Sequence, residues 1–600
     1  MPTKVIPINY TSREFNSIKN DLVQYAKRYY PDTFQDFNEA SFGALMLDTV
    51  AYIGDVMSFY IDYQVNETFL DTAVEYNNIV RLGRQLGYKQ SGYPSSFGLI
   101  SLYLLVPANS TGLGPDLNYL PILQKSSIFG SAGGGTFSLL EDVDFSNSSV
   151  EVVVGKVNAN TGVPTHYALK TVGKVVSGQN SLKQVAVAGF ERFKRVRVGN
   201  SAISEIISVT DSDGNEYYEV EHLSQNVVYK SIINTNSDKD VVVNVLKPII
   251  APRRFTVERT GNSLFLQFGY GSDSELTTKS IHDPLNITLN MHGKDFSTDR
   301  EFDPSKMLNT DKFGICPVNT TLNIKYRQNS PGRTSAPAGR INSVINSKFR
   351  FRNMDKITGA NKKDVQTSLE VVNDEPITGG TPETTTTELK RRILGHFAAQ
   401  NRAVTKQDYL ALVNTMPAKY GFVKRCNIIR DPDSLKRNLN LYVVGENANG
   451  SLTAMTMTAK ENLKAWLNTN RMINDSIDIL DAKIVNFGIS FSVKAHPSAD
   501  KTAVLSRCQS ALKRQYTGRN NLLDIAEPLY ISKAYTILNR VKGVLDVKSV
   551  KILPKEGSLY SNSTFDFDDQ RAPDGTYIAV PDNVILELKY PNMDIEGTVK

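Results

Sequence analysis

The sequence predicts a multidomain α+β protein with a helical N-terminal domain, a β-rich middle domain and C-terminal α+β sandwich modules. Three observations lead to this fold class. Apolar residues recur at three- and four-residue steps between Phe42 and Tyr88, which is typical of helices. Short apolar runs separated by Gly, Asn and Ser clusters continue from Leu99 to Phe268, which is typical of strands. After Glu388, strand-like and helix-like runs alternate.

Length, charge and cysteine usage indicate a large folded protein. At about 150 residues per domain, a chain of 600 residues suggests roughly four packing units. The chain has 68 basic and 62 acidic residues, and this small surplus does not predict nucleic-acid binding. Cys316, Cys426 and Cys508 are far apart and form no C-x-x-C pair, which favours buried free thiols in a reducing compartment.

No membrane association is expected. The opening MPTKVIPINY lacks the basic and apolar regions of a secretory signal. We also expect no segment to reach the ~20 apolar residues that a bilayer-spanning helix needs.

The first domain, residues 1–90, is expected to contain three helices. Thr11 and Glu14 form a capping-box pattern for a helix ending near Arg28. The second helix has an apolar face made of Phe42, Met46, Ile53, Met57, Tyr60 and Ile61. The third pattern runs from the acidic start Asn66-Glu67 to the stop signal Gly87-Tyr88 and includes Phe69, Ala73, Ile79, Leu82 and Leu86.

Aromatic residues of the second helix are spread around its circumference. Tyr52, Phe59, Tyr60 and Tyr63 fit a helix that contacts two surfaces, because Tyr and Phe are favoured at interfaces. They fit equally well as core residues of a three-helix domain.

Residues 91–372 are expected to form the β-rich middle region. Its strands are predicted at residues 99–106, 150–157, 203–209, 216–220, 241–246 and 264–268. Within the segment FLQFGYG, the glycines Gly269 and Gly271 predict a turn with positive φ after Phe268. The stretch NDEPITGGTPETTTT, residues 373–387, is rich in Thr, Pro and Gly and is predicted to be a linker and hinge.

Residues 388–553 are expected to form an α+β dimerisation or ring domain, followed by a C-terminal extension, residues 554–600. Thr385 and Glu388 form a second capping-box pattern, and Thr405 is placed to cap the next helix. Further helices are predicted around residues 459–467, 503–516 and 531–541, between strands at 439–444, 477–493 and 544–552.

Several of these segments together resemble the baseplate wedge proteins of T-even-type contractile-tailed phages, which belong to the baseplate J-like family. The chain departs from the family pattern at Tyr270, where an acidic residue is usual, and at Ala336-Pro337, where Asn-Val is usual. The residues that carry the resemblance are Asn66, Glu67, Gly87, Tyr88, Phe268, Gly269, Gly271, Arg402, Ala403, Val404, Thr405, Asp408, Tyr409, Gly543 and Val544.

The resemblance implies a structural subunit without catalysis or cofactors, placed in the tail baseplate of a virion and assembled in the host cytoplasm. It implies that two copies pair with one elongated wedge protein through a helical core bundle, and that the C-terminal module makes ring contacts between wedges. The inner ring so formed would transmit the contraction switch and contact other wedge proteins and hub-proximal or sheath-initiating proteins. The expected bundle residues are Met46, Ile53, Met57, Tyr60, Phe69 and Leu82.

The residues themselves suggest little chemistry. The six histidines form no H-x-x-x-H pair, so a metal site is not expected. Asp211-Ser212-Asp213-Gly214-Asn215 fails the EF-hand spacing and is predicted to be a hairpin turn. The acidic cluster 566–569 is read as a solvated loop without a rigid frame, and the basic run 192–197 as a strand face or a subunit contact.

Two other function classes stay open from the sequence. A host-surface glycan-binding tail component would suit the Gly-rich β region. A polysaccharide-degrading enzyme would require an acid pair at a defined separation, which a sequence alone does not reveal.

Overall fold

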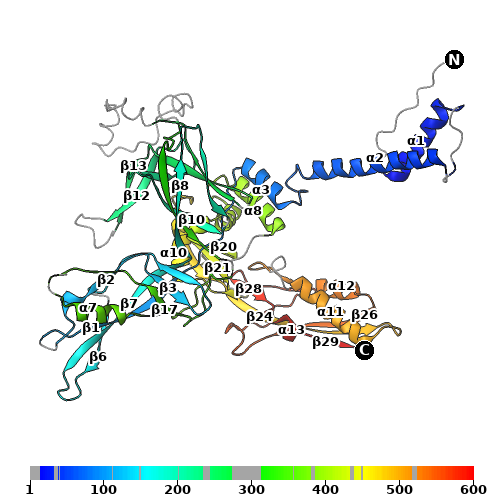
Figure 1. Cartoon of the computed structure of the whole chain (residues 1–600). Coiled ribbons are helices and arrows are strands. Elements are labelled where there is room, and N and C mark those ends of the chain that lie inside the picture. Colours follow the sequence, from blue (N-terminus) through cyan, green and yellow to red (C-terminus); the bar gives the residue numbers. More distant parts are fainter. Residues whose placement is uncertain are drawn as a thin grey trace. The chain divides into compact units, whose positions relative to one another are not determined.

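The computed structural model describes residues 14–32, 38, 41–110, 113–147, 150–200, 202–233, 244–261, 263–272, 313–330, 332–353, 355, 357–379, 385–432, 438–447, 450–516 and 523–600. The chain divides into two compact units (Figure 1). The N-terminal unit comprises residues 1–88 and 386–393. The main unit comprises residues 89–385 and 394–600. The capping-box residue Thr11 lies outside the described residues.

The N-terminal unit is helical. It contains α1 (Phe15–Tyr29), α2 (Phe42–Asn66), α3 (Tyr76–Gln85) and the first half of α8 (Thr386–Ala399). Ile79 and Tyr88 pack with Leu389 and Ile393 of α8 in a small apolar core. The packing is close, because a side chain at Gly83 would overlap Ile393. The sequence did not predict that residues 386–393 belong with the first helices.

The first half of the main unit is built on an antiparallel sheet whose order is β17-β3-β4-β7-β1-β19, with β6 beside β7. Its core lies between this sheet, the small sheet β18-β2-β5 and helix α7. The elements are β1 (Phe97–Pro107), β2 (Pro121–Leu123), β3 (Ile128–Ser131), β4 (Thr136–Leu139), β5 (Val143–Asp144), β6 (Glu151–Val157), β7 (Pro164–Ser177), β17 (Ile341–Asn346), β18 (Phe349–Phe351), α7 (Gly359–Thr367) and β19 (Glu370–Val372).

A second sheet has the order β8-β16-β10-β11-β14-β15-β9 and encloses a core that includes Phe255 and Phe268. The β12–β13 hairpin is separate from it. The strands are β8 (Gln179–Val187), β9 (Arg195–Asn200), β10 (Ile203–Thr210), β11 (Glu216–Glu219), β12 (Val227–Ile233), β13 (Asn244–Ile250), β14 (Arg254–Thr260), β15 (Ser263–Phe268) and β16 (Thr320–Gln328). The predicted hairpin turn at Asp211 is confirmed between β10 and β11.

A third sheet, in which β21 pairs with β20, β22 and β23, packs against α9 and α10. The elements are α9 (Lys406–Asn414), β20 (Arg425–Arg430), β21 (Asn438–Glu446), β22 (Leu452–Thr453), α10 (Met457–Asn468) and β23 (Ser476–Asp481). The strand predicted over residues 477–493 is two strands, because β23 ends at Asp481 and a new strand begins at Lys483 after Ala482.

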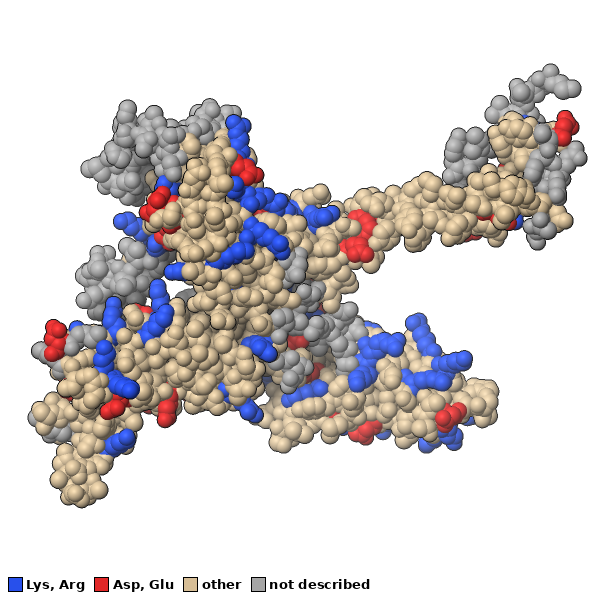
Figure 2. Space-filling model, in the orientation of Figure 1, with Lys and Arg blue, Asp and Glu red and all other residues tan. Residues whose placement is uncertain are grey.

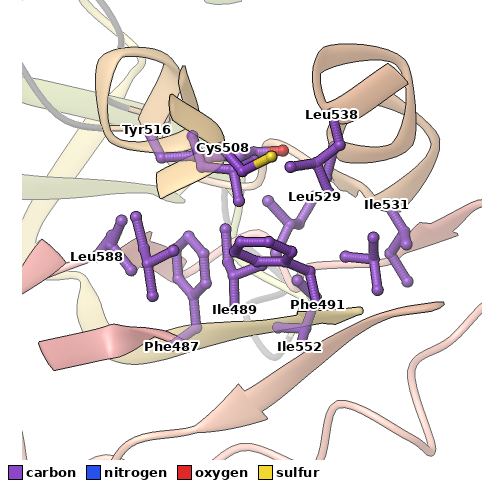
Figure 3. Close-up of a cluster of buried hydrophobic side chains, with 14 of the residues drawn as sticks. Phe487, Ile489, Phe491, Cys508, Tyr516, Leu529, Ile531, Leu538, Ile552 and Leu588 are labelled. Carbon is purple, nitrogen blue, oxygen red and sulfur yellow. The ribbon is translucent and has the colours of Figure 1, made fainter. Parts of the chain in front are cut away.

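Residues 483–600, here called the C-terminal module, surround the long strand β24. Side chains of β24 such as Phe487 and Phe491 point toward α11 and α12 and fill the core with Cys508 and Leu538 (Figure 3). The elements are β24 (Lys483–Ala495), α11 (Lys501–Tyr516), β25 (Leu529–Tyr530), α12 (Ile531–Asn539), β26 (Val544–Pro554), β27 (Tyr577–Ile578), β28 (Val584–Glu587), α13 (Pro591–Asp594) and β29 (Ile595–Val599).

The expected C-terminal extension is part of this module. β28 and β29 both pair with β24 in parallel, while β26 pairs with it antiparallel. The acidic cluster also has a frame that the sequence reading did not expect, because Phe567 is buried in the module core.

The start of the expected linker is built into the main unit. Asn373 is 0% exposed, and its side-chain amide donates to Pro337 O (2.8 Å) and Glu375 O (2.9 Å). Its Oδ1 accepts from Ile341 N (2.8 Å). Residues 373–379 thus differ from the expected hinge because this buried amide joins three backbone segments. Residues 380–384 lie outside the described part.

Candidate interaction surfaces

Helix α2 is apolar over most of its circumference, and among the described residues of its unit α1 is the helix that packs along it. Ser41 caps it, with its Oγ accepting from Ala44 N (3.1 Å). Lys19 of α1 forms an ion pair with Asp48 (2.7 Å), and Ile18 lies against Gly54. Only Ala44 and Ala51 of α2 are buried. Figure 2 shows α2 mostly uncharged on the side in view.

Five of the six expected bundle residues are exposed. Met57 is 58% exposed and Tyr60 is 64% exposed, and Met46, Ile53 and Phe69 are similar. Leu82 differs, because it packs partly buried against the core that α3 forms with α8. The contact of Leu82 with a partner stays a prediction, and within this chain its side chain packs against the cluster that contains Leu389 and Ile393 of α8.

The exposed apolar residues of α2 form two adjacent heptad seams. One seam contains Met46, Val50, Ile53, Met57 and Tyr60, at alternating steps of four and three residues. The other contains Phe42, Leu45, Tyr52, Phe59 and Tyr63. A seam with this spacing is the contact surface of a coiled coil.

By length and composition alone, α2 could cross a bilayer, with a mean hydropathy of 1.3. The expectation that no segment reaches this length and apolarity was therefore wrong. Asp48, Asp55 and Asp62 recur every seven residues on one face of the helix. Each aspartate at a bilayer centre costs about 2.5–3.5 kcal/mol, which favours contact with protein helices instead.

Asn66 and Glu67 join α2 to α3. Glu67 is buried, and its carboxylate accepts from Val74 N (2.8 Å) and Asn78 Nδ2 (2.9 Å). The Asn78 hydrogen bond is the main cause of a lowered pKa for Glu67. Thr72 Oγ1 donates to Asn66 O (2.6 Å). These bonds hold residues 67–75 in a turn, so the third helix begins at Tyr76 and not at the predicted Asn66-Glu67.

Gly87 and Tyr88 end this helix as predicted. Gly87 has a φ of +84°, which glycine adopts without strain. Tyr88 N donates to Gly83 O (2.9 Å), and its ring is buried against α8.

Gly269 and Gly271, which follow Phe268, allow two backbone segments to approach each other closely. Gly269 and Gly271 do not have the predicted positive φ. A side chain at Gly269 would lie 2.1 Å from Gly314 O, and Gly271 N donates to that same oxygen (3.0 Å). The motif therefore fastens β15 to residues 313–316, while the Phe268 ring fills the core of the second sheet.

The segment Arg402–Tyr409 forms one wall of a cavity. Thr405 caps α9 in a full capping box with Asp408, which confirms the predicted cap. Ala403 is buried and its N donates to Asn470 O (2.9 Å). Tyr409 OH donates to Asp475 Oδ2 (2.6 Å), and burial is the main cause of its raised pKa.

This cavity has a volume of about 660 Å³. It is lined by Val404, Lys406, Tyr409, Ile428, Ile429, Arg430, Leu439 and Asp475. Ala403 hydrogen-bonds the start of a turn at Asn470. Within this turn, beside the cavity, Ile473 is 97% exposed. The walls of the cavity are mainly apolar, with Lys406, Arg430 and Asp475 as its charged members.

Gly543 and Val544 form the turn from α12 into β26. Gly543 has a φ of +99° and its oxygen accepts from His496 N (2.9 Å). A side chain there would lie 2.9 Å from Val504, so the turn is packed against α11.

Other groups that the sequence singled out have structural roles. Arg195 of the basic run pairs with Glu258 (2.9 Å) and lies over the Phe265 ring. Asp211 Oδ1 accepts from Asp213 N and Asn215 N within the hairpin turn. Cys316 and Cys508 are buried free thiols, and Cys426 is half-buried. Within the described ranges, no cluster of His, Cys, Asp and Glu is placed to hold a metal ion.

Comparison with known proteins identifies the class of the first domain. Residues 14–85 match the family described as "Bacteriophage baseplate protein, N-terminal domain". No curated protein matches the chain. Residues 14–85 are thus similar to a baseplate N-terminal domain, and this match supports a structural baseplate component in a virion or tail-like particle.

Two solved structures are similar at low identity. A chain of the anti-feeding prophage baseplate has a TM-score of 0.27 and 10% identity, over 96% of this chain and 98% of that chain. A chain of the TssK-TssF-TssG baseplate subcomplex of the type VI secretion system has a TM-score of 0.22 and 9% identity, over 74% of this chain and 96% of that chain.

Proposed function

We propose that this protein is a wedge subunit of a contractile baseplate that works by holding other chains together. The exposed apolar face of α2 is the observation that carries the proposal. Burying a side chain such as Met57 or Ile53 is worth about 1.5–3 kcal/mol, so an uncovered face of this size strongly favours association.

The width of this face supports two partner helices. A two-stranded coiled coil covers one seam of each helix, whereas α2 exposes two adjacent seams on the side away from α1. We therefore propose that α2 packs in a bundle with a second copy of this chain and with a helix of an elongated wedge protein. The cavity beside Tyr409 and the C-terminal module are then available for further contacts.

The C-terminal module is proposed to make ring contacts between wedges. A closed ring needs contacts between two different surfaces that repeat by rotation. Folding of residues 554–600 onto β24 gives this module a single core, as a rigid ring element requires.

The test is co-expression of the chain with neighbouring tail genes, followed by native mass measurement. The proposal predicts a complex with two copies of this chain and one elongated partner. A chain that stays alone at high concentration in the presence of all wedge proteins would contradict it.

A further inference from the structure

One end of the C-terminal module is basic. His496 N donates to Gly543 O (2.9 Å) and Arg507 Nη1 donates to Lys542 O (3.3 Å), so the start of α11 lies at the C-terminal end of α12. The segments that meet here carry five basic residues against the two carboxylates of Asp500 and Asp546. We call this the basic end, and its members are Lys501, Arg507, Arg540, Lys542 and Lys548. Figure 2 shows lysine and arginine gathered over the α11 and α12 side of the module.

The opposite end of α12 is acidic. Ile531 N donates to Thr576 O (2.9 Å) and Ala572 N donates to Tyr577 O (3.0 Å), which places residues 566–574 at the N-terminal end of α12. This segment, here called the acidic end, has Asp566, Asp568, Asp569 and Asp574 against one Arg571. The nine residues of α12 separate the two ends by about 13 Å.

Both ends are held in place, and their charges are largely unpaired. Phe567 is buried in the core, and Asp566 Oδ1 accepts from Asp568 N (2.9 Å). In the part of the chain that is described, the five cations of the basic end form no ion pair, and the acidic end has only the exposed Asp568–Arg571 pair at 3.8 Å. Unpaired like charges concentrated in this way repel one another until an opposite charge covers them.

Each end also exposes apolar surface. Leu545 is exposed beside the basic end, three residues after Lys542 in the chain. At the acidic end the Tyr530 and Tyr577 rings lie 5.9 Å apart and are exposed. Apolar and aromatic groups surrounded by charges are the usual composition of a protein interface.

We propose that the basic end of one copy docks on the acidic end of a second copy, head to tail. The inference rests on the proposed function for the presence of several copies, and it names the two surfaces that meet. A symmetric dimer through either end alone would bring like charges together, which is unfavourable. A contact between two different ends leaves one of each free, so it can repeat from copy to copy.

The test uses two matched variants of the full chain. In the first, Arg540→Glu and Lys542→Glu make both ends of the module negative. In the second, Asp568→Lys and Asp569→Lys make both ends positive. The α2 substitutions Ile53→Lys and Met57→Lys are present in every protein tested, so that association through α2 is suppressed. Self-association is measured by sedimentation at low and at high salt.

We expect each variant alone to self-associate at least tenfold more weakly than the unchanged module, because like charges then meet. A one-to-one mixture of the two variants should associate again, since a negative end of one faces a positive end of the other. High salt should weaken this mixed association.

A control carries Lys363→Glu and Lys464→Glu, which change the charge equally on exposed sites outside the module, and it should behave like the unchanged module. Overturning results are a mixture that associates no better than its components, or an unchanged module that stays monomeric. The wedge proposal is tested separately. If it fails, co-expression gives no mixed complex, while the head-to-tail contact between copies of this chain is still observed.

Discussion

At the residue scale, the motif residues act as joints between backbone segments. The Glu67 carboxylate accepts a hydrogen bond from Val74 N in the turn that follows α2. The Asn373 side chain hydrogen-bonds three backbone segments, and Thr405 forms a capping box with Asp408 at the start of α9. Glu67 and Asn373 are buried, whereas Thr405 is exposed. Their polar atoms are used by the chain itself.

The hydrogen bond between Tyr409 and Asp475 should stabilise the wall of the cavity. We predict that Tyr409→Phe lowers the free energy of unfolding of the main unit by about 1–3 kcal/mol, because a charged acceptor loses its donor. Tyr420→Phe is the matched control, since no hydrogen bond of that hydroxyl is found among the described residues and its ring keeps its tilted contact with Trp466. Urea unfolding measures the free energy of unfolding of both variants. Equal losses in Tyr409→Phe and Tyr420→Phe would contradict a stabilising role of the Tyr409–Asp475 hydrogen bond.

The lowered pKa of Glu67 gives a pH dependence to the joint between α2 and α3. Because the folded-state pKa is lower than that of an unfolded glutamate, about 4.3, this stabilisation is present above that pH and is lost as pH falls through the folded pKa. We expect lower amide protection factors in α3, relative to the intrinsic exchange rate at each pH, as the pH becomes acidic. Glu67→Gln should remove this dependence, whereas Asp71→Asn should leave it; retention in Glu67→Gln would contradict the assignment.

Individual residues were predictable where the signal was local. The cap at Thr405 follows from a four-residue pattern, and it is confirmed. Gly269 was predicted to allow a positive φ, but its reason is the oxygen of Gly314, which approaches from 45 positions away in the chain. A local sequence pattern carries no information about a contact between residues so far apart in the chain.

At the element scale, α2 was recognised from its apolar period, and its exposed seams agree with the aromatic residues spread around it. The beginning of α3 was placed too early because Phe69 and Ala73 continue the apolar spacing. Side-chain bonds from Thr68 to Val65 O (2.6 Å) and from Thr72 to Asn66 O compete with the helix there.

Substitutions on the α2 seam should separate folding from assembly. We predict that Ile53→Lys with Met57→Lys abolishes the mixed complex in co-expression while the melting temperature of the isolated chain changes little, because both side chains are exposed. The control variant, Asp55→Lys with Asp62→Lys, introduces two lysines on the face of α2 that carries its aspartates. Greater loss of the complex in this control than in the seam variant would argue against the seam.

The joint between β15 and residues 313–316 should not tolerate a side chain. We predict that Gly269→Ala destabilises the second sheet by about 1–3 kcal/mol, because its Cβ would overlap two backbone oxygens. Gly189→Ala is the control, since nothing lies within 4 Å of its Cβ position. Thermal unfolding compares them, and a neutral Gly269→Ala would refute the close-approach explanation.

At the scale of the whole molecule, the fold class was predictable from the order of helical, strand-like and alternating segments. The grouping of distant segments was not. Residues 386–393 pack with α3 across about three hundred residues, and β29 joins β24 across about one hundred. Both groupings depend on tertiary packing of short segments whose local sequence is compatible with several neighbours.

The central claim is that other chains cover the apolar face of α2 in the assembled baseplate. The direct measurement is the labelling rate of a thiol introduced by Met57→Cys, compared between the isolated chain and purified baseplates, with Asp62→Cys as the control. The account predicts rapid labelling in the isolated chain and at least tenfold slower labelling in the baseplate. Equal rates in both would contradict it.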